Sequence, residues 1–264
     1  MARVRCNLQR DGLRSQRQPA LQPVDHRGSL PCRELRTLTI ADCPRLRSEA
    51  LTAVLAPPSP SALRKASSRQ GPLQLGSHLT SLSISDCPLL SPAILSTLPV
   101  MPQLRSLQFR HCGAADECVV LPERVPRLEE LCLAGQRVTD HGAGLVSGFA
   151  TLKTLDLSGT ALTAAGVSAL APLSALESLD ISWPSDTSTA IYPPPLPRLR
   201  VLRMDGCTLG GEWLEAYTLH ASVYGAGSLF TTLTELSVGG AARAVVSGDP
   251  VRCKHSYICD NGGI

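Results

Sequence analysis

Thiol and imidazole side chains gather near the end of the chain, in the stretch CKHSYIC. Cys253, His255 and Cys259 are of the ligand types that bind zinc in proteins. Their spacing matches no known zinc-finger pattern, however, and the sequence offers no evident fourth ligand. We therefore interpret these residues as an incidental cluster and expect no metal site.

Motifs that carry enzymatic chemistry are missing from the sequence. It has no G-x-S-x-G turn for a nucleophilic serine, no H-E-x-x-H zinc pair and no phosphate loop with G-K-[ST]. The dinucleotide-binding pattern G-x-G-x-x-G is also absent. The sequence therefore predicts a non-enzymatic protein without a cofactor, and leaves binding as the chemistry to look for.

The remaining polar residues are positioned by a repeat of the form L-x-x-L-x-L. From Leu79 to Leu199, successive copies begin 25, 24, 24, 24 and 23 residues apart. A period of this size with this pattern is typical of leucine-rich repeats. We therefore predict an α/β leucine-rich repeat solenoid, a horseshoe with a parallel concave sheet and short convex helices or irregular segments. The copies begin at Leu35, Leu79, Leu104, Leu128, Leu152, Leu176, Leu199 and Leu233.

Each copy predicts one short strand, whose leucines point into the core and whose alternate residues point to the concave side. Asp156 and Asp180 then lie on neighbouring strands, with Glu130 one strand before them. Carboxylates held this close repel one another unless a cation meets them, and Arg203 on the next strand is one candidate. The fifth residues of the copies form a central column: Thr39, Ser83, Gln108, Cys132, Asp156, Asp180, Arg203 and Ser237.

This face is the candidate binding site for a protein partner. We expect its carboxylates to bind a basic segment of that partner; the alternative is a solvated polar face without a ligand. Trp183, beside the column, is either an anchor for the partner or a cover for the solenoid edge. The candidate partner-binding residues are Gln108, Arg110, Glu130, Asp156, Asp180, Trp183, Arg203 and Asp205.

Helices are expected on the segments that return from one strand to the next. The apolar stretch SEALTAVL fits a helix after the first copy, and Gly142–Val146 and Ala164–Leu170 fit two more. Thr139 and Thr163 are candidate caps, because a hydroxyl can accept a hydrogen bond from a free backbone N–H at a helix start. The proline run 193–195 instead predicts an extended segment.

The repeats occupy residues 32–240 and carry an insertion rich in proline and serine at 56–78. Residues 1–31 hold six arginines against two aspartates and predict a disordered basic arm. An organelle transit peptide and a nucleic-acid-binding arm are alternatives, although the net charge of +3 does not favour nucleic acid. Residues 241–264 lack the repeat, so they form either an irregular cap or the end of a fragment or altered isoform.

Four of the ten cysteines occupy the ninth position of a repeat: Cys43, Cys87, Cys112 and Cys207. This position points into the solenoid, where a small thiol packs well. We therefore expect reduced packing residues and a cytoplasmic or nuclear protein rather than a disulfide framework. No apolar run reaches the roughly 18 residues of a membrane span, and no membrane association is expected.

The stretches LTSLSISDCPLL, VTDHGAGLV and LTAAGVSAL resemble the cysteine-containing leucine-rich repeat subfamily, over roughly residues 32–240. Repeats of that subfamily commonly follow an F-box, and the resemblance then implies substrate recognition for an SCF-type ubiquitin ligase. The ninth positions Gln136, Thr160, Pro184 and Ala241 depart from the pattern. This sequence also has no room for an F-box, so Skp and cullin subunits would bind through a missing domain. The alternative is a scaffold or sensor in signalling or innate immunity.

Overall fold

The computed structural model describes residues 3–5, 35–55, 75–91, 94–113, 116, 122–185, 190–194, 196–209 and 232–239. They belong to two compact units, divided between Leu128 and Glu129. Residues 56–74 of the predicted insertion and the whole of residues 241–264, with the cluster of Cys253, His255 and Cys259, lie outside the described residues. The division into arm, repeat domain and tail therefore stays a prediction.

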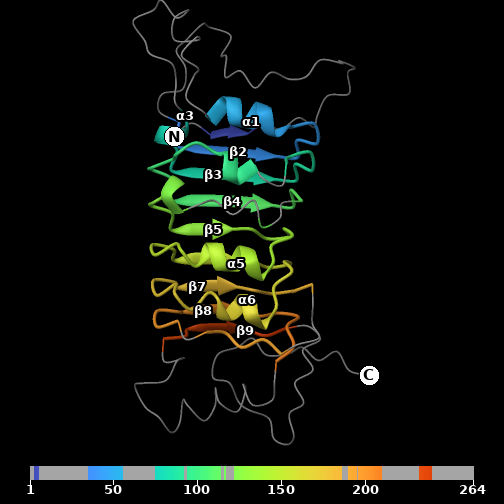
Figure 1. Ribbon diagram of the computed structural model, residues 1–264, viewed down its shortest axis with the longest axis vertical. Coiled ribbons are helices and arrows are strands. Elements are labelled where there is room, and N and C mark those ends of the chain that lie inside the picture. Colours follow the sequence, from blue (N-terminus) through green and yellow to red (C-terminus); the bar gives the residue numbers. More distant parts are fainter. Residues whose placement is uncertain are drawn as a thin grey trace, which may run out of the picture. The chain divides into compact units, whose positions relative to one another are not determined.

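The first unit contains parallel strands in the order β1 (Arg3–Arg5), β2 (Thr37–Ala41), β3 (Ser81–Ser85) and β4 (Ser106–Arg110) (Figure 1). Its helices are α1 (Ser48–Leu55), α3 (Leu75–His78) and α4 (Ile94–Thr97), and a 3-10 turn spans Pro122–Arg124. The helix predicted for SEALTAVL is confirmed as α1.

Two elements of this unit differ from the expectation. Arg3–Arg5 lies in the arm that was expected to be disordered, yet it pairs with β2 as strand β1. The alternation of arginine and valine in these residues suits a strand, but three residues are too short for a periodic signal. Helix α3 lies at the end of the 56–78 insertion, where no helix was expected.

The second unit contains parallel strands β5 (Glu130–Cys132), β6 (Thr154–Asp156), β7 (Ser178–Asp180), β8 (Val201–Arg203) and β9 (Glu235–Ser237). Its helices are α5 (Asp140–Val146) and α6 (Ala164–Ser168), drawn in yellow-green and yellow in Figure 1. Residues 191–194 form neither helix nor strand, as expected for this proline-rich segment.

Leucine side chains build the core of both units because they alternate with polar residues along each strand. In β6 and its continuation, Leu155 and Leu157 are buried, whereas Thr154 is exposed. Buried side chains of the helices, such as Val146 and Val167, complete the core. The thiols Cys43, Cys87, Cys112 and Cys207 are buried and belong to no disulfide, as predicted for the ninth position.

Helices α5 and α6 begin at the predicted caps. The hydroxyls of Thr139 and Thr163 accept hydrogen bonds from the backbone N–H groups of His141 and Ala165. Asp140 joins the two helices, since its carboxylate accepts hydrogen bonds from the backbone N–H and the hydroxyl of Thr163, at 2.8 and 2.6 Å. The T-D-x-G sequence therefore caps one helix and ties it to the next.

Candidate protein-binding face

We define the variable face as the side of the sheet that carries the third, fifth and seventh residues of each repeat. Within the second unit the predicted column is confirmed: Cys132 pairs with Asp156, Asp156 with Asp180, Asp180 with Arg203, and Arg203 with Ser237. In the first unit, Thr39 pairs with Ser83 and Ser83 with Gln108.

The two central aspartates differ in how many hydrogen bonds their carboxylate oxygens accept. Asp156 Oδ1 accepts hydrogen bonds from the backbone N–H and the hydroxyl of Ser158, and its Oδ2 lies 3.1 Å from the Cys132 thiol. Asp180 Oδ1 accepts one hydrogen bond, from the Ser182 backbone N–H at 3.0 Å. Asp180 therefore keeps more capacity than Asp156 to accept hydrogen bonds from a ligand.

Two further carboxylates flank this pair in the second unit. Glu130 is exposed on β5, next to the strand of Asp156. Asp205 lies just beyond β8, where its Oδ1 accepts hydrogen bonds from the Ser237 hydroxyl and the Gly239 backbone N–H. Asp205 therefore also connects the β8 and β9 repeats, so it has a structural role besides the one proposed for it.

Arg203 lies beside Asp180 in the sheet, but it forms its ion pair with Glu235 on β9 at 2.6 Å. The hydrogen bond to Glu235 raises the pKa of Arg203, and the charges of Asp180 and Asp205 act in the same direction. Arg203 therefore interacts with the charge of Asp180, as expected, but its ion pair is with Glu235. Both side chains of the pair are 40% or more exposed, so it contributes under about 1 kcal/mol and a competing charge can open it.

Trp183 follows β7 and is 58% exposed, although it is one of the largest apolar side chains. Its backbone φ of 56° lies in the left-handed region. The backbone N–H of Trp183 donates a hydrogen bond to the Asp205 carbonyl at 2.6 Å. Its indole lies against Gly206, because a Cβ placed on that glycine would come within 2.5 Å of Trp183 Cε3. The position is thus fixed by the next repeat, and the indole keeps a solvent-exposed surface.

Gln108 and Arg110 belong to β4 in the first unit. Gln108 Oε1 accepts a hydrogen bond from the Ser83 hydroxyl at 3.4 Å, and Arg110 is exposed at the end of the strand. The other candidates, Glu130, Asp156, Asp180, Trp183, Arg203 and Asp205, all lie in the second unit. We therefore treat the candidates of each unit separately.

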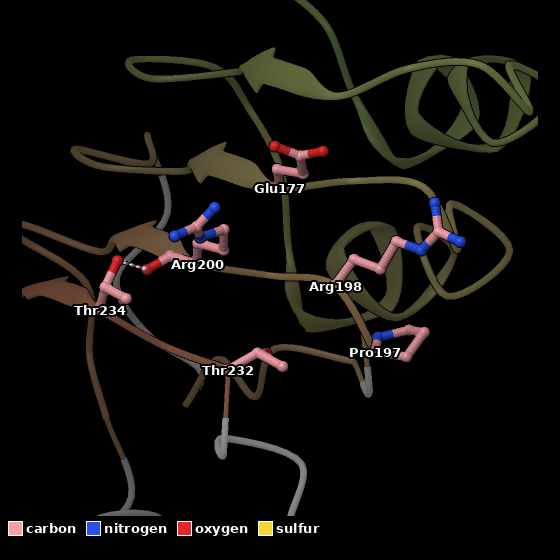
Figure 2. A pocket seen from close by; sticks show the side chains of 6 residues that line it. All are labelled: Glu177, Pro197, Arg198, Arg200, Thr232 and Thr234. Carbon is pink, nitrogen blue, oxygen red and sulfur yellow. Dashed lines mark hydrogen bonds between the residues drawn. The ribbon is translucent and has the colours of Figure 1, made fainter.

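A hollow of about 340 Å³ lies where β7, β8 and β9 begin, and it was not expected from the sequence. Figure 2 shows that the Arg198 and Arg200 side chains point to different sides of it. The Thr232 and Thr234 hydroxyls donate hydrogen bonds to the carbonyls of Leu199 and Arg200, at 2.6 and 3.1 Å. The guanidinium groups do not converge, so this hollow is not arranged to bind an anion.

Other site types have no support among the described residues. No group of three or more His, Cys, Asp or Glu side chains there is placed to hold a metal ion. None of the helices described is both long and apolar enough to cross a membrane.

Comparison with known proteins agrees with this geometry at the level of the repeat. Residues 150–171 match a family model described as a leucine-rich repeat. No curated protein matches the chain. A chain in the solved structure of the Toll–Spatzle complex, a molecular hub in Drosophila development and innate immunity, is similar at 16% identity with a TM-score of 0.39. The match covers 78% of the present chain and 35% of that chain, so this sequence spans about a third of its length. The fold is an α/β leucine-rich repeat solenoid.

Proposed function

We propose that this chain is a protein-protein interaction module whose variable face in the second unit binds a basic segment of a partner protein. Leucine-rich repeats support binding through the exposed residues of their strands, as the regular core leaves those positions variable. The observation that carries the proposal is the column formed by Asp156 and Asp180, with Glu130 on the strand before it.

Charge complementarity favours a basic partner over an acidic one. Within the described part of this face, Arg203 already has Glu235 as its ion-pair partner, whereas Asp180 accepts a single hydrogen bond. A partner's arginine or lysine would add positive charge beside Asp156 and Asp180 and so weaken the repulsion between them.

The test is a titration of the full chain against a labelled arginine-rich peptide, followed by fluorescence anisotropy at two salt concentrations. We expect saturable binding that weakens with salt and is lost when Asp156 and Asp180 are both replaced by lysine. The control reverses two exposed glutamates of the first unit, Glu49→Lys and Glu123→Lys, and so changes the net charge by the same amount. An equal loss of peptide affinity in both variants would show that net charge alone explains the effect, and it would contradict a binding site on this face.

The identity of the assembly is a further part of the proposal. Substrate recognition for an SCF-type ubiquitin ligase is supported by the resemblance to cysteine-containing repeats, and a scaffold or sensor role in signalling or innate immunity is the alternative. Capture of the endogenous protein with its companions separates them, because Skp and cullin subunits accompany only the ligase form. The buried thiols that form no disulfide support a reducing compartment, cytoplasmic or nuclear.

A further inference from the structure

The residue in the eighth position of the repeats is left-handed throughout the described part of the chain. It is Gly135, Gly159 and Gly206 in three repeats, with φ between 65° and 72°. In the others it is Asp42, Asp86, His111 and Trp183, with φ between 49° and 56°. Glycine has no Cβ penalty in this region, and Asp and His are enriched there, whereas a bulky residue is an outlier. Trp183 therefore occupies a position that local conformation does not favour for tryptophan.

Burial of the side chain does not offset the cost of this backbone conformation at Trp183. The side chain remains 58% exposed. One part of the indole is supported by Gly206, whose lack of a Cβ makes room for it. An indole that contacts Gly206 and is still 58% exposed leaves most of its aromatic surface available to a ligand.

A carboxylate with spare hydrogen-bonding capacity lies close to this residue along the chain. Asp180 binds the backbone N–H of Ser182, which is the residue directly before Trp183. Asp180 Oδ1 has this one bond, and no hydrogen bond to Asp180 Oδ2 occurs among the described residues. The combination of an exposed indole and an open carboxylate suits a ligand group that is both planar and cationic.

We infer that Trp183 and Asp180 recognise an arginine of the basic segment, with the guanidinium stacked on the indole and hydrogen-bonded to the carboxylate. The inference rests on the proposed function and specifies the residue type that it recognises. Arginine fits better than lysine because its guanidinium is planar, stacks on aromatic faces and binds carboxylates through two N–H groups at once. Trp183 thereby distinguishes two basic side chains of equal charge.

The experiment uses the full chain with Trp213→Phe, so that Trp183 is the one remaining tryptophan. An arginine-rich peptide and its lysine counterpart are titrated, and both affinity and tryptophan emission are recorded. We expect the arginine peptide to bind about tenfold more tightly, which corresponds to about 1.4 kcal/mol, and to shift the emission to shorter wavelength. Trp183→Leu in the same background keeps a Cβ and an apolar side chain, and it should remove this preference.

Three results would overturn the inference, and only the last of them also contradicts the proposed function. If both peptides bind equally, or if Trp183→Leu keeps the arginine preference, arginine recognition fails while the acidic face still binds basic segments. If neither peptide binds the chain with Trp183 intact, the proposed function fails as well. Circular dichroism of each variant checks that the repeats remain folded.

Discussion

The contact between Trp183 and Gly206 gives a prediction that can be tested without any ligand. Replacement of Gly206 by alanine adds a Cβ at 2.5 Å from Trp183 Cε3 and at 2.9 Å from Cζ3, so the indole has to move. Gly159 is the matched control, because its φ of 65° is close to the 72° of Gly206. A Cβ on Gly159 meets its nearest atoms, the backbone of Gly135, at an ordinary 3.6 Å.

The expected magnitudes follow from this difference. Gly159→Ala carries the cost of a left-handed alanine alone, about 1 kcal/mol. Gly206→Ala carries the same cost and also displaces the indole, which adds about 1 kcal/mol. This addition is at the lower end of the range for overpacked sites, because the exposed ring can move outward. Gly206→Ala should therefore destabilise the chain by about twice as much as Gly159→Ala.

The assay is urea unfolding followed by circular dichroism, with the midpoint and slope of each variant compared. In a Trp183→Ala background, the two glycine substitutions should cost the same, since the obstructing ring is gone. Equal costs with Trp183 present would refute the contact on which arginine recognition depends. A larger cost for Gly206→Ala that persists without the tryptophan would refute it in the same way.

Four other predictions concern the residues that hold the face in place. Asp140→Ala should destabilise the chain by about 2 kcal/mol in urea unfolding, because it removes two hydrogen bonds to Thr163. Gly166→Ala should also be destabilising, since its Cβ would come within 2.2 Å of Asp140 Oδ1. The free-energy cost of Gly166→Ala should fall in the Asp140→Ala background, and additive costs of the two substitutions would contradict the contact. Gly144→Ala should instead stabilise by about 0.5–1 kcal/mol, because helix α5 leaves open space there; a lower midpoint would contradict this. Burial and the nearby Asp180 and Asp205 charges raise the pKa of Cys207 from 9.0 to about 12. The stability that the neutral thiol contributes should therefore be complete below pH 9 and lost between pH 9 and 12. Cys207→Ala should flatten that part of the plot of unfolding free energy against pH.

The repeat period allowed much of the fold to be predicted. It gave the strands, their register within each unit and the central column, because a strict spacing of leucines leaves only one way to alternate side chains. Thr139 and Thr163 were identified as caps because a hydroxyl directly before an apolar helical stretch has a local chemical signature. By contrast, strand β1 depends on pairing with residues more than thirty positions away, which no local pattern reveals.

The site was predictable in its residues but less so in its contacts. The alternation rule placed Asp156 beside Asp180, but it did not reveal that Arg203 turns to Glu235, because side-chain direction depends on the neighbours on both strands. The left-handed backbone of Trp183 has no local signal, because tryptophan does not favour it; only the glycines at the same position of other repeats indicate it.

The central claim is that the carboxylates of the second unit bind a basic segment, and one comparison tests it most directly. The affinity of the arginine-rich peptide is measured for the native chain, for the Asp156→Lys and Asp180→Lys double variant, and for the Glu49→Lys and Glu123→Lys control. The account predicts that the control binds within about twofold of the native chain and that the Asp156 and Asp180 variant does not bind. Native-like affinity in that variant, with its fold intact, would contradict the claim.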